Sequence, residues 1–86
     1  MSESEIVERV RNGLNDEGKK WNLEFAVDER VLREGAWLQV FVKSNSNRSN
    51  RAAESQIISD VESELSETTG EELLIVPVQE FVGVTA

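Results

Sequence analysis

Serine and carboxylate side chains are the main chemically reactive groups of this chain, because the sequence contains neither histidine nor cysteine. It therefore has no imidazole to act as an acid or base near neutral pH, and no thiolate to attack a substrate or hold zinc. A serine nucleophile would need a lysine or carboxylate partner. No serine stands in the Gly-x-Ser-x-Gly context of a nucleophile elbow. We therefore predict that the chain is not an enzyme and has no catalytic residues.

Carboxylates are the one remaining kind of metal ligand, and they suit hard cations such as Ca²⁺ or Mg²⁺. Asp60, Glu64 and Glu67 are spaced four and three residues apart, as on one flank of a helix, and Glu71 and Glu72 follow. The spacing of an EF-hand loop is absent from the sequence. We expect no metal and no cofactor. The acidic flank is either a solvated surface, which is the simpler interpretation, or a contact for a basic partner.

A basic, polar segment lies in the middle of the chain. Lys43, Arg48 and Arg51 lie in or beside the run 44–50, which otherwise contains only serine and asparagine. A helix is predicted to start just after this run, and helix N-termini attract anions through free N–H groups and a partial positive charge. These three cations are therefore candidate anion contacts. The run has no glycine to wrap a phosphate, so a polar loop is the simpler interpretation.

The segment 36–43, Ala-Trp-Leu-Gln-Val-Phe-Val-Lys, offers apolar side chains to both faces of a strand. Alternation would place Leu38, Val40 and Val42 on one face and Trp37 and Phe41 on the other. The pattern alone leaves open which set is buried. If the first set packs on helices, Trp37 and Phe41 lie on an open face and become candidate contacts for a partner or a second copy. Unpaired edge strands would offer a second route to association.

Periodicity predicts two helices. Apolar residues at helical spacing indicate a helix over about residues 3–15, stopped near Gly18, with Ser2 and Glu5 placed to form a capping box. A second helix begins after Ser49 or Asn50 and ends at Gly70, a residue suited to a helix C-terminus.

Strict alternation over 21–28 predicts a first strand, which a charged turn over 29–35 joins to the strand over 36–43 as an antiparallel hairpin. The apolar run 73–76 predicts a third strand that is central or covered on both sides, ending at Pro77. Residues 79–86 either extend this strand or form a tail. The order α-β-β-α-β predicts an α+β two-layer sandwich, in which both helices cover one face of a three-stranded mixed sheet.

Length and composition fit one small domain spanning residues 1–86, since 38% of the 86 residues are hydrophobic and 30% are charged. The lack of cysteine favours a reducing compartment, and the first residues have neither the basic nor the apolar part of a secretory signal, so we expect a cytoplasmic protein. No apolar run approaches the roughly 20 residues of a membrane span.

The net charge of −8 disfavours nucleic acid and anionic membranes as partners. Our first hypothesis is a small acidic binding or regulatory module that is not an enzyme and acts through protein–protein contact, either with another protein or with a second copy. Its candidate contacts are Trp37, Phe41, Asp60, Glu64 and Glu67. The second hypothesis is a binder of RNA or a phosphate-bearing ligand that uses Lys43, Arg48 and Arg51, and an enzyme is a distant third.

Overall fold

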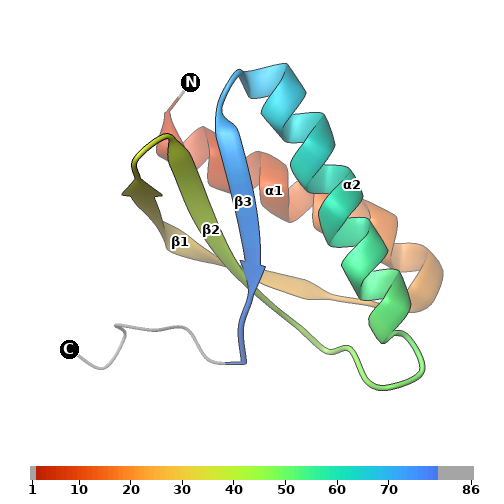
Figure 1. Ribbon diagram of the computed structural model, residues 1–86. Coiled ribbons are helices and arrows are strands. Elements are labelled where there is room, and N and C mark those ends of the chain that lie inside the picture. The colour runs from red at the N-terminus through yellow and green to blue at the C-terminus, as the bar shows by residue number, and fades with distance from the viewer. Residues whose placement is uncertain (1, 80–86) are drawn as a thin grey trace.

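Two long helices lie on one side of a three-stranded sheet in the computed structural model, which describes residues 2–79 (Figure 1). The order of helices and strands is α1, β1, β2, α2, β3, with a short 3₁₀ turn, η1, between α1 and β1. This confirms the predicted two-layer α+β sandwich. Within residues 2–79, neither helix is long and apolar enough to cross a membrane.

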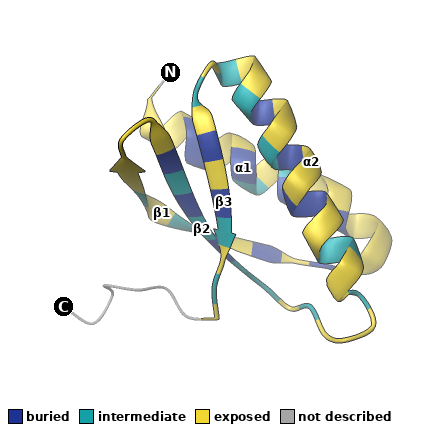
Figure 2. Cartoon of the chain, viewed as in Figure 1, coloured by how far each residue is buried: buried dark blue, intermediate teal, exposed yellow. Residues whose placement is uncertain are grey.

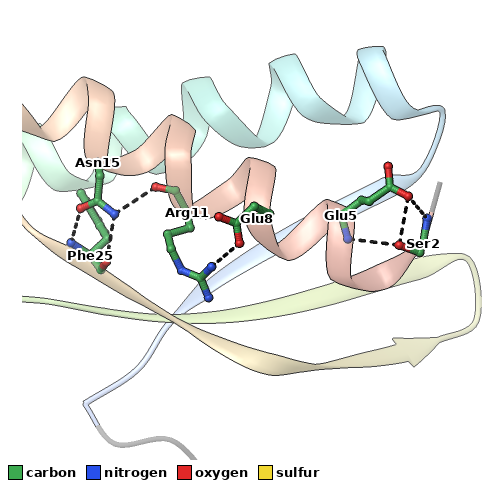
Figure 3. Close-up of polar contacts among 6 residues, drawn as sticks. All are labelled: Ser2, Glu5, Glu8, Arg11, Asn15 and Phe25. Atoms are coloured by element: carbon green, nitrogen blue, oxygen red, sulfur yellow. Dashed lines mark hydrogen bonds and ion pairs between the residues drawn. The ribbon is translucent and has the colours of Figure 1, made fainter.

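Helix α1, Glu3–Gly18, begins with the predicted capping box (Figure 3). The Ser2 hydroxyl accepts a hydrogen bond from the Glu5 N–H at 3.2 Å, and the Glu5 carboxylate accepts one from the Ser2 N–H at 3.4 Å. These bonds satisfy backbone donors that have no partner within the helix. The helix then buries Ile6, Val7, Val10 and Leu14, the predicted apolar stripe.

Helix α1 stops at Gly18, as predicted, although it extends beyond the predicted span of about 3–15. The helix continues to Gly18, which keeps right-handed helical dihedrals, and η1, Lys19–Trp21, extends the turn. The residue that adopts the left-handed conformation is Asn22, with φ at 56°. Gly18 is needed for close packing instead, because a Cβ atom there would lie 2.7 Å from the carbonyl oxygen of Leu23.

Strand β1, Phe25–Glu34, starts later and ends later than predicted. Trp21 lies in η1 and is 53% exposed, so the alternation that includes it is not all strand. The charged segment 29–34, predicted as a turn, belongs to the strand and leads to a hairpin loop of only Gly35 and Ala36. Gly35 has φ at +62°, the conformation that glycine supplies in tight hairpins. Charged residues are tolerated here because most of this half of β1 is exposed.

Strand β2, Trp37–Ser44, is the centre of the sheet, antiparallel to β1 and parallel to β3, Glu72–Pro77. Helix α2, Arg51–Thr69, makes the crossover between β2 and β3 and ends at Gly70 with φ at +74°, as predicted. The prediction that the third strand is central or covered on both sides is wrong, because β3 lies at the sheet edge. Its buried and exposed residues alternate, as Figure 2 shows.

The core lies between the sheet and the helices. Leu38, Val40 and Val42 of β2 are at most 1% exposed and belong to one cluster with the buried residues of α1 and α2. This decides the orientation that the sequence left open: the other side of β2, with Trp37 and Phe41, faces away from the helices. Of the segment 79–86, only Gln79 lies within the described residues.

Asn15 joins α1 to the first residue of β1 (Figure 3). Its side-chain amide donates to the Phe25 carbonyl at 3.1 Å and accepts from the Phe25 N–H at 2.8 Å. A second bond from the same amide nitrogen reaches the carbonyl of Arg11 at 3.0 Å. The amide therefore pairs with Phe25 as a neighbouring strand would, on the edge of β1 that faces away from β2.

Candidate functional site: the open face of the sheet

The side of the sheet that faces away from the helices carries apolar side chains from all three strands. Paired residues on neighbouring strands point to the same side of a sheet. The register pairs Gln39 with Leu32 of β1 and Leu74 of β3, and pairs Phe41 with Val76. We call this surface the open face, and its members are Leu32, Trp37, Phe41, Leu74 and Val76, with Gln39 at their centre.

The open face differs sharply from the inner face in exposure. Trp37 is 48% exposed, Leu32 47% and Leu74 37%, whereas the inward residues of β2 are almost completely buried. Phe41 and Val76 are half-buried. Three of the four large apolar side chains that the described residues expose therefore lie on this one surface, and the fourth, Trp21, lies in η1.

The sequence identified Trp37 and Phe41 but missed Leu32, Leu74 and Val76. Leu32 falls in the segment predicted as a charged turn, and Leu74 and Val76 were expected to lie in a strand that is central or covered on both sides. Instead Val31 packs against the core and Leu32 points the other way. Only the strand register assigns these residues to the open face. That register depends on the length of β1 and on the position of β3 at the sheet edge.

Phe41 lies in a shallow hollow with Asp28, Arg30, Val31 and Leu32. Residues 28–30 of β1 bulge opposite it, since the register shifts between Val27 and Val31. The Asp28 carboxylate accepts a hydrogen bond from the Arg30 N–H at 3.0 Å and lies 4.0 Å from the Arg30 Nε. The paired side chains of Asp28 and Arg30 therefore line the same hollow as the Phe41 ring.

Charged residues border both ends of the open face. At the hairpin end, Glu34 and Glu72 flank Trp37 in register. At the other end, Lys43 follows Phe41 on the same side of β2, and Arg30 lies beside the Phe41 ring. The surface is thus acidic at the hairpin end and apolar in the middle, and at the other end the Arg30 guanidinium is paired with the Asp28 carboxylate.

The predicted acidic contacts lie elsewhere. Asp60, Glu64 and Glu67 are exposed on α2, in the helix layer, so the structure does not bring them together with Trp37 and Phe41. Asp60 accepts a hydrogen bond from the Gln56 amide at 2.9 Å. Within residues 2–79, no three acidic side chains gather as a metal site would require.

The predicted anion contacts are only partly brought together. Lys43 and Arg51 line one hollow between β2 and the start of α2, whereas Arg48 is exposed in the loop and does not line it. Glu54 lines the same hollow, and its carboxylate accepts hydrogen bonds from the hydroxyls of Ser44 and Ser46. An incoming phosphate would meet this carboxylate, so the arrangement disfavours an anion site.

The outer edge of β3 is closed to further strand pairing. The Leu73 N–H donates to the Ser66 hydroxyl at 3.2 Å, and the Ile75 N–H donates to the Glu62 carboxylate at 2.8 Å. Pro77, at the next position with the same orientation, has no N–H to donate. Strand addition at the β3 edge is therefore blocked, so of the two sheet edges only that of β1 is left for this route to association.

Replacing Glu62 with alanine should destabilise the protein by about 1–2 kcal/mol, because a partly buried N–H loses a charged acceptor. It should also promote association through the β3 edge. Urea denaturation and light scattering measure the two effects. Glu67→Ala, which removes the same charge from an exposed site on α2, is the matched control. Equal stability and equal scattering of the two variants would show that Glu62 does not protect the edge.

Comparison of the chain with models of protein families, with curated proteins and with solved structures finds no match.

Proposed function

We propose that this chain is a binding or regulatory module that is not an enzyme, and that its open face contacts another protein. The proposal rests mainly on one observation about β2: both of its sides carry apolar side chains, but only the inner side is buried. Its inner side chains are fully buried, while Trp37 and Phe41 on its outer side join the apolar residues of both neighbouring strands. Contiguous exposed apolar surface of this kind is typical of protein interaction sites, which are rich in aromatic residues.

Two further features support this function. The closed edge of β3 removes one of the two sheet edges as a place for strand addition, so it favours contact through side chains of the sheet face. The chemistry of the chain favours binding over catalysis, since the sequence lacks imidazole and thiol groups. The absence of cysteine also supports our proposal that the protein works in the reducing cytoplasm.

The test is the double variant Trp37→Ser with Phe41→Ser. We expect it to stay folded, because neither residue is part of the buried cluster, and to lose association. Trp21→Ser is the matched control, since Trp21 is similarly exposed but lies outside the sheet. Circular dichroism melts measure folding, and sedimentation velocity and capture of binding proteins measure association.

The possible results of this experiment distinguish a contact surface from a structural role of Trp37 and Phe41. Loss of association in the folded double variant, with association kept by Trp21→Ser, supports the proposal. Unfolding of the double variant would mean that Trp37 and Phe41 stabilise the fold instead of a contact. Identical sedimentation and identical captured proteins for the wild type and the folded double variant would contradict the proposal.

A further inference from the structure

We propose that the outer edge of β1 pairs with the same edge of a second copy of the chain, so that two sheets join into one sheet of six strands. The two β1 strands would run in opposite directions about a two-fold axis through Leu32, and both copies would use identical residues. The inference goes beyond the proposed function, because it concerns the edge of the sheet and leaves the open face available to another protein.

The hairpin determines which backbone groups of β1 point outward. Its loop has only two residues, so Glu34 and Trp37 close it with their N–H and C=O groups directed at each other. These groups alternate in direction along a strand. Those of Leu32 therefore point to β2, whereas those of Val31 and Arg33 point away from β2, at the outer edge of the sheet.

Side chains leave this edge of β1 open. They stand roughly perpendicular to a sheet, so those of residues 31–33 lie over its faces. Val31 packs against the core and Leu32 lies on the open face. The Arg33 guanidinium pairs with the Glu71 carboxylate of its own chain at 3.3 Å. Within residues 2–79 no strand pairs with this side of β1, and Figure 2 shows the second half of the strand mostly exposed.

The other positions at which a strand could add are occupied. Near the start of β1, the Asn15 amide already pairs with the backbone of Phe25. On β3, the Ser66 hydroxyl and the Glu62 carboxylate accept from two backbone N–H groups. Both outer edges of the six-stranded sheet would be β3 edges, so the assembly would stop at two copies. One open edge in each chain thus favours a closed pair of identical chains.

Leu32 is the residue that suits the two-fold axis. Backbone groups that point outward must lie opposite one another, so the axis has to pass through a residue of the strand. With the axis through Leu32, Val31 of each copy lies opposite Arg33 of the other, and the two residues exchange both of their N–H···O bonds. The two Leu32 side chains, each 47% exposed in the single chain, then meet at the position where side chains of paired strands come closest.

Neighbouring positions of the axis fit less well. An axis through Arg33 would place two arginines directly opposite each other, and like charges in that arrangement destabilise a sheet. An axis through Val31 would require Glu29 to bond with Arg33 of the second copy. Glu29 lies in the bulge between Val27 and Val31, where the strand is irregular. The axis through Leu32 avoids both costs.

The first experiment uses the absence of cysteine from the sequence, which makes an introduced thiol unique in each chain. In Leu32→Cys the Cα atoms of the two copies would lie about 4.5 Å apart, within reach of a disulfide. We expect a mild oxidant to link most of the concentrated protein at high ionic strength, which screens the like net charges of the two copies. Asp60→Cys, exposed on α2, measures random collisions, and Gln39→Cys, at the centre of the open face, reports contact between two open faces.

The second experiment removes a backbone donor from the edge. Arg33→Pro lacks the N–H that would bind Val31 of the second copy. Arg33→Ala is the matched control, because it loses the same side chain and the same contact with Glu71 but keeps the N–H. We expect Arg33→Pro to dimerise roughly tenfold or more weakly than Arg33→Ala, since a hydrogen bond is lost on each side of the axis. Sedimentation equilibrium gives the dissociation constants, and circular dichroism confirms that both variants are folded.

Three results would overturn the inference. Leu32→Cys that links no better than Asp60→Cys would show that the two edges do not meet at Leu32. Equal dissociation constants for Arg33→Ala and a folded Arg33→Pro would show that the outward N–H has no partner in a second copy. Linking through Gln39→Cys but not through Leu32→Cys would place the second copy on the open face. The proposed function is judged separately, by the proteins that the open face captures, because the edge pairing uses none of its aromatic residues.

Discussion

Replacement of Phe25 by alanine should lower the free energy of unfolding by about 3–5 kcal/mol, the usual cost of removing a buried phenylalanine. Phe25 opens β1, is 5% exposed and belongs to the core cluster. Its ring lies close enough to α1 that a Cβ added at Gly18 would be 3.2 Å from it. Small domains have total stabilities of about 5–15 kcal/mol, so a domain in the less stable part of that range would keep only about 0–2 kcal/mol after this loss.

Urea denaturation of the wild type and Phe25→Ala measures this change. Trp37→Ala is the informative control, because it removes a larger side chain from the open face of the same sheet. We expect the control to be much less destabilising when measured at a protein concentration where the chain is monomeric. A loss below about 1 kcal/mol for Phe25→Ala would contradict its place in the core.

Replacement of Asn15 by leucine should cost about 2–3 kcal/mol. The substitution keeps a side chain of similar size but removes both hydrogen bonds to the Phe25 backbone and the bond to the Arg11 carbonyl. Leaving a part-buried donor and acceptor without partners is more costly than losing an exposed hydrogen bond. The junction between α1 and β1 would then loosen where the sheet begins.

Hydrogen exchange at the Phe25 amide is the direct measurement of this junction, because the Asn15 side chain accepts from that N–H. We expect much faster exchange in Asn15→Leu. Asn15→Asp is the matched control, since it keeps the acceptor and removes the donor, and it should fall between the other two proteins in both stability and exchange. Unchanged exchange in Asn15→Leu would show that other groups protect the amide.

Local patterns predicted most of the fold. The apolar stripe and capping box of α1, the glycine that ends α2, and the alternation of β2 are each set by residues close together in the chain. The extent of β1 was not predictable in this way. Its second half is charged and exposed, and it is a strand because it pairs with β2 across a tight hairpin, a contact that charge pattern does not reveal.

The candidate site was predictable only in part, because alternation shows the two sides of one strand but not how neighbouring strands pair. Trp37 and Phe41 could be assigned to one side of β2 from alternation alone. Assigning Leu32, Leu74 and Val76 to the same surface requires the register of three strands, which is a property of the whole sheet. The effect of Glu54 on the basic hollow and of Glu62 on the β3 edge likewise arises from contacts between different segments of the fold, which periodicity within one segment does not reveal.

Fluorescence quenching of Trp37 tests the central claim, that protein covers the open face, most directly. In Trp21→Phe, Trp37 is the only tryptophan, and it lies within the proposed contact. We predict that acrylamide quenches it readily in dilute purified protein. Quenching should fall, with a shift of the emission to shorter wavelength, when a second copy covers the open face in concentrated protein or when a captured binding protein is added. Adding the charge change Gln39→Lys should prevent this protection. Quenching of Trp37 that stays the same both when the protein is concentrated and when the captured binding proteins are added would contradict the account.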